Sequence, residues 1–550
     1  MTRGSSLANS SHESRVTKYM IRGFRQIALL TALSRIFGMV RDIVYGYFFG
    51  ASGLLDAWLI AFKIPNLSRR LFGEGAASAS FIPVYSEVLH NDKEQAAVLL
   101  NTVVTVLFML LAGIVLVGQL GILTYLHFFA KTFDTELIMA LSMVMLPYML
   151  FICMVAILAG ILNVHKHFAT PAMAPIVLNI FIIGTILLTG RLMKIDSVTQ
   201  LAAVAVSVLL AGIVQLLIQI PPLKRAGVTI HAGWQVSLKP YKKILLLMGP
   251  MIIGLTVTQI NTLCDDLIAW WFSGSIDKGS TFALFGMVIH YPMQRGSVSH
   301  LYYAQRLYQL PLGVLGISLA TAIFPVMSAD AARKDFKALT QTISRGIRAT
   351  VFVALPATAG LIIVAKPLIT TIFQHGKFTY DDTSKVTVTL IFYSLGLSGY
   401  FAQQVLARAF YSIQDSITPV KSALMAVAAN IILNLTLIWF LSRAGLAAST
   451  AICAYFQVII LILILRRKVS SSVLDGLPGT VLKTLAGTFA MSFVCLGILT
   501  LMSYLPSGKR YDCLRLIVTI PAAVIVYIYS AKMLRNEMLS LFWTRRNKTI

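Results

Sequence analysis

The sequence of 550 residues has little charge for its length and lacks the short motifs of common enzymes. Charged residues make up 12% of the chain and hydrophobic residues 57%, whereas about a quarter of a soluble globular protein is charged. No GxxxxGK[ST] phosphate loop, HExxH or GxSxG motif occurs, so no ATP site or hydrolase of these classes is indicated. The composition predicts a protein that has the lipid bilayer as its main solvent.

Cysteine is also scarce, and its distribution excludes two kinds of site. The five cysteines are scattered, odd in number and mostly within apolar runs, with no CxxC pair. They therefore predict neither a disulfide framework nor a zinc site. The net charge of +25 would suggest nucleic acid as a partner of a soluble protein. In a membrane protein it reflects Lys and Arg in cytoplasmic loops, so no nucleic-acid partner is expected.

Long apolar runs are abundant and define the predicted fold class. Fourteen segments could each supply the ~20 residues that cross the hydrocarbon core. They are 26–49, 56–83, 96–121, 137–163, 169–190, 199–221, 243–273, 301–326, 347–370, 385–411, 417–441, 444–465, 481–504 and 514–533. The sequence therefore predicts an all-α polytopic membrane protein with 14 transmembrane helices.

The distribution of Lys and Arg predicts the orientation. With a cytoplasmic N-terminus, the segments inside hold 27 Lys and Arg and those outside hold 12, which favours cytoplasmic positions for both termini. Seven further cations fall within the spans, five of them in the first two. These seven are Arg35, Arg41, Lys63, Arg69, Arg70, Arg306 and Arg408.

An internal repeat predicts the domain organisation. FIPVYSE (81–87) resembles IFPVMSA (323–329), at an offset of 242 residues. Parallel repeats of this kind are typical of transporters that hold substrate between two halves. We therefore expect two pseudo-symmetric six-helix lobes followed by two C-terminal helices. The predicted boundaries are a cytoplasmic basic N-terminal segment (1–24), an N-lobe (25–223), a cytoplasmic linker (224–242), a C-lobe (243–468), and the last two helices with a cytoplasmic tail (469–550).

The cations within the spans need an explanation. A charge at mid-bilayer costs roughly 2.5–3.5 kcal/mol, so seven facing lipid would cost on the order of 20 kcal/mol, more than a typical folding free energy of ~5–15 kcal/mol. They must pair with acids, reach the interface or line a wet cavity. Internal ion pairing is one interpretation; an anion-binding cavity is the other. Arginine suits the latter because its planar guanidinium makes bidentate, charge-assisted bonds to phosphate.

Helical spacing divides these residues. Asp56, Lys63, Arg70 and Glu74 fall on one face of an ideal helix, where ion pairing is expected. Arg408 lies near a cytoplasmic span end, from which its side chain can reach the interface.

The sequence also predicts local geometry at two places in the first two spans. Asp42 directly follows Arg41, and successive helical residues are not expected to face each other. Pro65 is expected to kink its helix beside Asn66 and to free backbone carbonyls that can line a cavity.

Two long motifs resemble a known family. SRIFGMVRD (34–42) and DAWLIAFKIPNLSRRLFGEGAASASFIPVYSE (56–87) are similar to the signature of the MurJ (MviN) family of lipid II flippases. That family belongs to the multidrug/oligosaccharidyl-lipid/polysaccharide exporter superfamily. YYAQRLYQLPLGVLG (302–316), FQHGKFTYDD (373–382) and AFYSIQDSITPVK (409–421) extend the resemblance, which covers nearly the whole chain from about residue 25.

The resemblance implies a function and a site. Such proteins move lipid II, an undecaprenyl-diphosphate-linked disaccharide-pentapeptide, to the outer leaflet of the bacterial cytoplasmic membrane by alternating access, without enzymatic activity. Lipid II and membrane lipids are the implied partners, with other cell-wall synthesis proteins as further candidates. The implied diphosphate and head-group ligands are Arg35, Arg41, Arg69 and Arg306, and the supporting cavity residues are Asp56, Lys63, Asn66, Arg70 and Glu74.

The resemblance leaves coupling open between Na+ and the membrane potential. Asp265 and Asp415 are candidate Na+ ligands by position, and the last two helices are expected to take the lipid tail. Helical spacing places Arg70 on the Asp56–Lys63 face, but the motif favours Arg69 for the cavity, with Arg70 as second choice.

Three features depart from the family pattern or leave alternatives. Gln305 stands where an acid often precedes the arginine of span 8, and an apolar expansion, STFALFGMVIHYPM (280–293), precedes that span. Arg35 and Arg41 are about 240° apart on an ideal helix, so they share a face only if Gly38 loosens the helix.

The alternative functions are an exporter of another polyprenyl-diphosphate-linked glycan or of drugs, a membrane glycosyltransferase, and a non-transporting scaffold.

Overall fold

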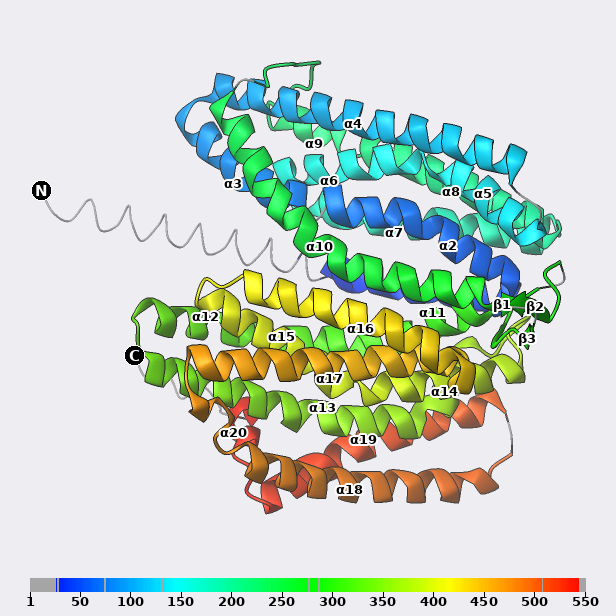
Figure 1. Cartoon of the computed structure of the whole chain (residues 1–550), viewed down its shortest axis with the longest axis vertical. Coiled ribbons are helices and arrows are strands. Elements are labelled where there is room, and N and C mark those ends of the chain that lie inside the picture. The colour runs from blue at the N-terminus through cyan, green and yellow to red at the C-terminus, as the bar shows by residue number, and fades with distance from the viewer. Residues whose placement is uncertain are drawn as a thin grey trace, which may run out of the picture. The chain divides into compact units, whose positions relative to one another are not determined.

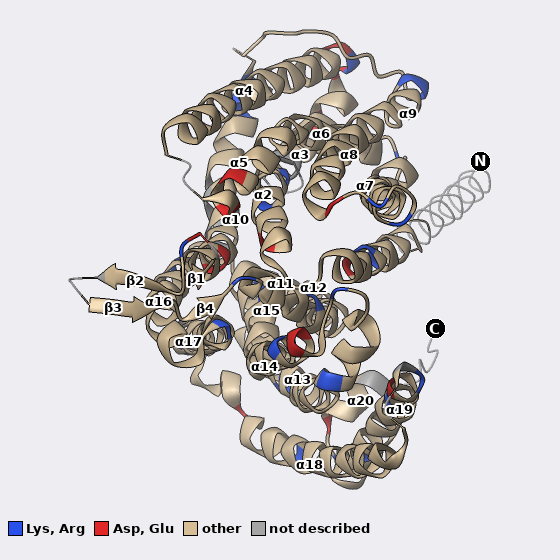
Figure 2. Cartoon of the chain, turned by 90° about the vertical axis from the view of Figure 1, so that its right-hand side faces the viewer, with Lys and Arg blue, Asp and Glu red and all other residues tan. Residues whose placement is uncertain are grey.

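The computed structural model describes residues 26, 29–73, 76–129, 132–236, 238–275, 277–284, 287–506 and 508–543. The predicted basic segment at 1–24 and the candidate Glu74 lie outside these residues. The described part of the chain is predominantly helical (Figure 1), and charged residues are sparse along most of its helices (Figure 2). The predicted all-α polytopic fold is confirmed.

The chain forms two compact units. The first contains the described residues up to Phe49 together with Leu54–Gln259, and the second contains Gly50–Gly53 and the described residues from Ile260 onward. This division falls inside α10 (Lys239–Trp271), whereas the sequence placed a boundary at the linker 224–242. The predicted domain boundaries stay a prediction.

The first unit begins with an unbroken helix at 29–49. Its other helical elements are α2 (Gly53–Ser68), a π-helical turn (Arg69–Gly73), α3 (Ala76–Asn91), α4 (Lys93–Phe128), α5 (Phe133–Met145), α6 (Tyr148–Val164), α7 (Ala169–Leu187), a second π-helical turn (Leu188–Leu192), α8 (Ser197–Leu217), α9 (Ile220–Arg225) and the first part of α10. The linker before α10 packs on α4, where the Gly233 amide donates to Thr105 Oγ1 at 3.0 Å.

The second unit continues from α10 into four short strands and the remaining helices. Its helical elements are α11 (Ser297–Pro311), a π-helical turn (Leu312–Gly316), α12 (Ile317–Ala332), α13 (Phe336–Phe373), α14 (Tyr380–Leu395), α15 (Leu397–Ser412), α16 (Ile417–Leu441), α17 (Arg443–Lys468), a 3-10 turn (Ser471–Leu474), α18 (Leu477–Leu501), a 3-10 turn (Met502–Tyr504), α19 (Lys509–Met533) and α20 (Met538–Trp543).

The count of fourteen spans is consistent with the structure. In the described part of the chain, nine helices are long and apolar enough to cross a membrane, or eleven if the bent pairs α5–α6 (42°) and α14–α15 (40°) are each one span. The other three predicted spans correspond to the helix at 29–49, to α2 with α3, and to α10. The first two of these three carry five of the seven cations, which lower their hydropathy.

The order of helical elements repeats between the units. A π-helical turn separates α2 from α3, and another separates α11 from α12, with an offset of 243 residues between Arg69 and Leu312. A long helix follows in each case, α4 or α13, and then a bent pair. Pro83 and Pro325, which the sequence comparison matched, both lie inside their helices. This order supports the predicted six-helix repeat.

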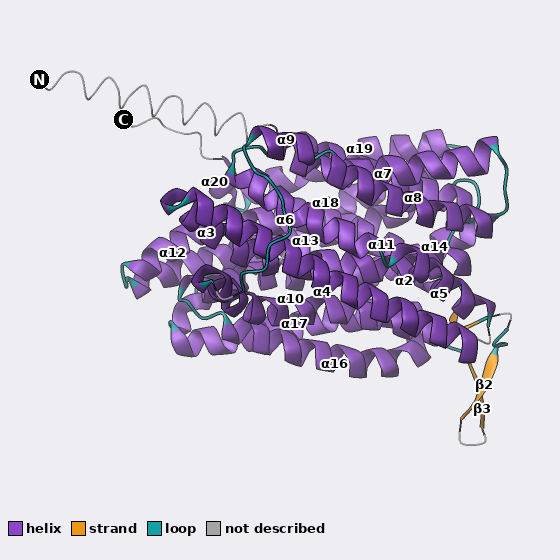
Figure 3. Cartoon of the chain, turned by 90° about the horizontal axis from the view of Figure 1, so that it is seen from above, coloured by secondary structure: helices purple, strands orange, loops and turns teal. Residues whose placement is uncertain are grey.

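The sequence predicted no strands, but among the described residues four short strands lie between α10 and α11, and β2 and β3 are labelled in Figure 3. β1 (Ser273–Gly274) pairs with β4 (Met293–Gln294) in parallel. β2 (Thr281–Leu284) pairs with β3 (Met287–His290) as an antiparallel hairpin. The apolar expansion before span 8 is therefore folded.

The last two long helices pack against α13. Phe352 of α13, Met491 of α18 and Tyr527 of α19 belong to one buried cluster, and the Tyr527 hydroxyl donates to the Phe352 carbonyl at 2.5 Å. Close packing and interhelical hydrogen bonds hold helices together in a bilayer, so α18 and α19 are integral parts of the second unit.

Candidate substrate-binding arginines and their surroundings

Arg41 is fixed within the first unit. Its Nη1 donates to Asn179 Oδ1 of α7 at 3.1 Å, and its Nη2 lies 2.8 Å from Asp42 Oδ1. Its guanidinium also lies 5.6 Å from the centre of the Tyr45 ring. The expectation that Arg41 and Asp42 would not face each other is wrong, because the long arginine side chain folds back to the carboxylate of the next residue.

Arg35 projects from the same helix in another direction. The helix at 29–49 is unbroken through Gly38, so the separation of six positions from Arg35 to Arg41 turns their side chains about 240° apart. Arg35 is exposed and Arg41 is half-buried. The two arginines therefore do not share a face, and Gly38 does not bring them together.

The π-helical turn after α2 separates Arg69 from Arg70. Arg69 donates through Nε and Nη2 to Asn66 Oδ1, at 3.1 and 2.9 Å. Arg70 is exposed, and its Nη1 donates to Gln259 Oε1 of α10 at 2.9 Å. The turn begins four residues after Pro65, which lacks an amide donor inside α2. Such π-helical turns are frequent at functional sites.

The predicted ion-pairing face is only partly retained. Asp56 is buried in the first turn of α2, and Lys63, two turns later, is half-buried on the same face. Arg70 follows within the π-helical turn, so its direction no longer follows the α-helical spacing. Glu74, the fourth member of this face, lies outside the described residues.

Arg306 and Arg408 form a comparable pair in the second unit. Arg306 lies on α11, 4.6 Å from the centre of the Tyr302 ring, and its Nη2 donates to the Tyr302 hydroxyl at 3.2 Å. Arg408 lies on α15, 5.7 Å from the centre of the Phe324 ring. Beside Arg306, Gln305 donates to the hydroxyl of Tyr393 at 3.1 Å. A neutral hydrogen bond thus stands at the position where an acid often precedes the arginine in the family pattern.

Asp265 lies in a buried polar cluster of α10, α16 and α17. Asn434 Nδ2 donates to Asp265 Oδ1 at 2.6 Å and to Asn430 Oδ1 at 2.9 Å. Asn430 also lies 3.5 Å from Thr450 Oγ1. Asn434 Oδ1 is buried and has no hydrogen-bond partner among the described residues. Sequence reasoning identified Asp265 but missed Asn434 and Thr450, since no spacing rule links residues so distant in the chain.

Asp415 lies elsewhere and has different partners. It precedes α16, accepts from the Thr418 amide at 3.0 Å, and pairs with Lys468 Nζ at 2.6 Å. Burial raises its pKa, but the bonds from Lys468 and Thr418 outweigh burial and bring the pKa to about 2. Asn434 is 19 residues further along α16, about 28 Å at 1.5 Å per residue. The structure therefore does not bring Asp415 and Asp265 together.

The described residues indicate no metal site besides the candidate Na+ ligands. They contain no group of three or more His, Cys, Asp or Glu side chains that could hold a metal ion. The structure describes all five cysteines, and none of them forms a disulfide bond.

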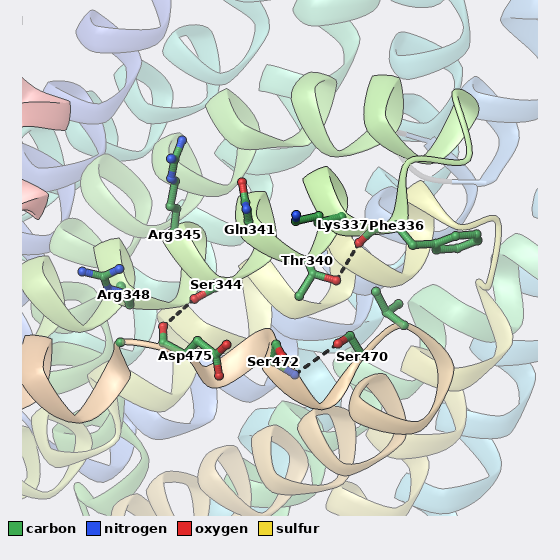
Figure 4. Close-up of a pocket in the computed structure, with 12 residues that line it drawn as sticks. Phe336, Lys337, Thr340, Gln341, Ser344, Arg345, Arg348, Ser470, Ser472 and Asp475 are labelled. Carbon is green, nitrogen blue, oxygen red and sulfur yellow. Dashed lines mark hydrogen bonds between the residues drawn. The ribbon is translucent and has the colours of Figure 1, made fainter.

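A cationic pocket of about 640 Å³ lies between the first turns of α13 and the segment before α18 (Figure 4). Lys337, Arg345 and Arg348 line it. The Ser344 hydroxyl donates to the Asp475 carbonyl at 2.8 Å across it. The pocket therefore has three cationic side chains and one carboxylate, that of Asp475, in its lining.

Arg348 also ties three elements together, and its removal should lower stability. Its Nε donates to the buried Thr480 of α18 at 2.8 Å, and its Nη2 pairs with Glu537 at 2.6 Å. The hydrogen bond and charge of Arg348 hold the pKa of Glu537 below its ordinary value. Arg348→Ala should cost about 1–2 kcal/mol, mostly through the buried bond, because exposed ion pairs contribute little.

Thermal unfolding of the purified protein measures this loss. Arg345→Ala, in the same pocket, is the matched control and should change stability by less than about 0.5 kcal/mol. Equal losses from both variants would show that pocket charge, rather than the bond to Thr480, sets the stability.

Comparisons with known proteins identify the family. The family model "Lipid II flippase MurJ" matches residues 45–509. The "Probable lipid II flippase MurJ" of Vibrio cholerae is 33% identical, over 81% of this chain and 83% of that protein. The "Lipid II flippase MurJ" of Burkholderia cenocepacia is 30% identical, over 82% and 84%.

Solved structures agree with this assignment. "Lipid II flippase MurJ, inward closed conformation" superposes with a TM-score of 0.75 at 25% identity, covering 93% of this chain and 99% of that chain. An inward-facing MATE transporter of the MOP superfamily shares the fold, with a TM-score of 0.64 at 15% identity over 80% and 96%. The chain belongs to the MurJ family of lipid II flippases.

Proposed function

We propose that this protein flips lipid II, the undecaprenyl-diphosphate-linked peptidoglycan precursor, from the inner to the outer leaflet of the bacterial cytoplasmic membrane. The observation that carries the proposal is the family match across residues 45–509. The protein is a multi-pass transporter, not an enzyme, and it supplies precursor for peptidoglycan synthesis, cell-wall biogenesis and cell shape. Lipid II and membrane lipids are its partners, and other cell-wall synthesis proteins are proposed as further ones.

Four arginines are proposed to contact the diphosphate and head group during transport. They are Arg35, Arg41 and Arg69 of the first unit and Arg306 of the second. Asn66 Oδ1 accepts from Nε and Nη2 of Arg69 and so fixes the direction of its guanidinium. The hydroxyl and ring of Tyr302 likewise hold the guanidinium of Arg306 in place. Guanidinium groups of this kind bind phosphate oxygens bidentately at any physiological pH.

The remaining candidates are proposed to support this set. Asn66 orients Arg69, while Asp42 and Asn179 orient Arg41. Asp56, Lys63, Arg70 and Glu74 are proposed as the cavity support that the family signature implies.

Alternating access is the proposed mechanism, with both termini in the cytoplasm. The excess of Lys and Arg in the segments assigned to the inside supports this orientation. The lipid tail is proposed to lie along the last two helices. An apolar cavity of about 750 Å³ lined by α19, α20 and the turn between them supports the part of α19 in this placement. Ile525, Ile528, Lys532 and Arg535 are among its lining residues.

Coupling to Na+ at Asp265 is also proposed. Carboxylate, amide and hydroxyl oxygens are ligands of hard cations, and Asp265, Asn434 and Thr450 supply one of each within a connected cluster. Asp415 is a weaker candidate, because Lys468 already neutralises it. The membrane potential, at about 2.3 kcal/mol per charge per 100 mV, is the alternative drive.

Depletion in a bacterium with no other lipid II flippase tests the proposed function. Lipid II should then accumulate in the inner leaflet, and expression of this chain should restore its appearance outside. A leaflet-resolved lipid II assay measures both, with the expression level matched to the undepleted strain. Normal outward appearance of lipid II after depletion would contradict the proposal.

A further inference from the structure

The apolar expansion before α11 forms a compact β insertion with a defined base. β1 and β4 pair at that base, and the Ser273 hydroxyl donates to the Gln294 carbonyl at 3.1 Å. The Tyr291 amide donates to the Ser280 carbonyl at 3.0 Å. The β2–β3 hairpin extends beyond these contacts. Its direction is therefore set by hydrogen bonds rather than by a flexible linker.

Aromatic side chains fasten this base to the ends of two membrane-spanning helices. The Phe272 and Trp439 rings meet edge to face at 5.8 Å between centroids, and Phe282 of β2 lies 6.3 Å from Trp439. On α10, the Trp270 ring lies 4.4 Å from Lys278 Nζ. Tryptophans gather at membrane–water interfaces because one end of the ring is apolar and the indole N–H is polar. The base therefore lies at interfacial depth.

The outer half of the hairpin is apolar on both faces. Met287 and Val288 are consecutive in β3, so they point to opposite faces, and they are 62% and 74% exposed. The sequence from Gly279 to Met293 has no Asp, Glu, Lys or Arg. A two-faced apolar hairpin surrounded by water would be an aggregation-prone element.

The hairpin projects across the direction of the helices. Figure 3 shows β2 and β3 at one end of the second unit, running at a right angle to the helices. Figure 2, which looks along the helices from that end, shows the hairpin extending sideways beyond α16. The outer side of α16 is itself apolar and exposed, with Ile432 at 64% and Phe440 at 83%. The hairpin therefore overhangs an exposed apolar surface of a membrane-spanning helix, which we expect to face lipid.

We propose that the β2–β3 hairpin is an interfacial anchor that lies in the headgroup region of the leaflet at this end, with Met287 and Val288 in contact with lipid. A two-stranded hairpin leaves the outer edge of each strand with unpaired amides and carbonyls. Such groups are not tolerated in the hydrocarbon core, but headgroups and interfacial water can satisfy them. The backbone thus sets the depth, and the apolar side chains supply the attraction. This inference does not depend on the transported substrate or on which leaflet is involved.

A fluorescent label at Val288 tests the anchor in the full chain reconstituted in lipid nanodiscs. Val288→Cys is made in a Cys513→Ser background, which removes the exposed native thiol, and is labelled with an environment-sensitive dye. Ile432→Cys on α16 is the reference for the hydrocarbon core, and Ser471→Cys, an exposed position at the start of a 3-10 turn, is the reference for water. Spin-labelled lipids carrying the quencher on the headgroup or at the centre of the acyl chain report depth.

The Val288 label should be quenched at least about twofold more by headgroup quencher than by chain-centre quencher, and the Ile432 label should show the reverse. A Val288 label that matches Ser471 in emission and in quenching by aqueous iodide would overturn the anchor. Quenching that matches Ile432 would overturn its interfacial depth. Because the protein is purified, a protein partner that covers the hairpin in cells cannot mimic the lipid result.

Discussion

Arg306→Ala is expected to reduce lipid II flipping about 10- to 100-fold, whereas Arg408→Ala is expected to leave it within about twofold of the parent. Hydrogen bonds to charged groups contribute about 1.5–3 kcal/mol. Loss of bonds of this strength between Arg306 and the diphosphate corresponds to the reduction of about 10- to 100-fold expected for Arg306→Ala. Arg306 is proposed to make these bonds; Arg408 is not.

Arg408 is a well-matched control for Arg306. Both arginines are half-buried in the second unit, and each lies over one aromatic ring, at 4.6 Å for Arg306 and 5.7 Å for Arg408. Loss of either guanidinium therefore removes a similar cation–π contact, worth about 0.5–2 kcal/mol. A difference in flipping between the two variants cannot come from that contact alone.

Two further variants separate charge from geometry and extend the test to the first unit. Arg306→Lys keeps the charge but loses the planar fork, so it should fall between the parent and Arg306→Ala. Arg35→Ala should also lose complementation, because Arg35 is proposed to contact the same diphosphate.

These variants are tested by complementation of a depleted strain and by a leaflet-resolved lipid II assay at matched expression. If only Arg408→Ala fails, the assignment of the substrate-binding arginines is wrong. If Arg35→Ala and Arg306→Ala both complement fully, the diphosphate is bound by other residues.

The sequence predicted the membrane fold because hydropathy acts over long segments. It also located the cations, since a charged residue within an apolar run is visible without a structure. It did not predict the hairpin, because strands of four residues inside an apolar stretch lack a clear two-residue alternation.

Side-chain geometry was harder to predict than position. Cβ directions placed Arg41 and Asp42 apart, but the length of arginine allowed a 2.8 Å contact. Spacing on an ideal helix placed Arg70 with Asp56, but a π-helical turn intervenes. Asn434 and Asp265 are 169 residues apart in the chain, so only packing of α16 on α10 reveals their contact.

Asp265→Asn is expected to abolish the stabilisation of the protein by Na+. A ligand that binds only the folded state stabilises it by RT ln(1 + [L]/Kd), about 2.7 kcal/mol at one hundred times Kd. The parent protein should therefore melt at a higher temperature in sodium chloride than in choline chloride at equal ionic strength. Asparagine retains the size of Asp265 but removes the negative charge that a cation requires.

Asp415→Asn separates this effect from a general loss of stability. Asp415 pairs with Lys468 and caps α16 through Thr418, so its substitution should lower the melting temperature equally in both salts. It should preserve the difference between sodium and choline, which Asp265→Asn should remove. A parent protein with no such difference, or an Asp265→Asn variant that retains it, would exclude Na+ at this cluster. The membrane potential would then be the remaining proposed drive for transport.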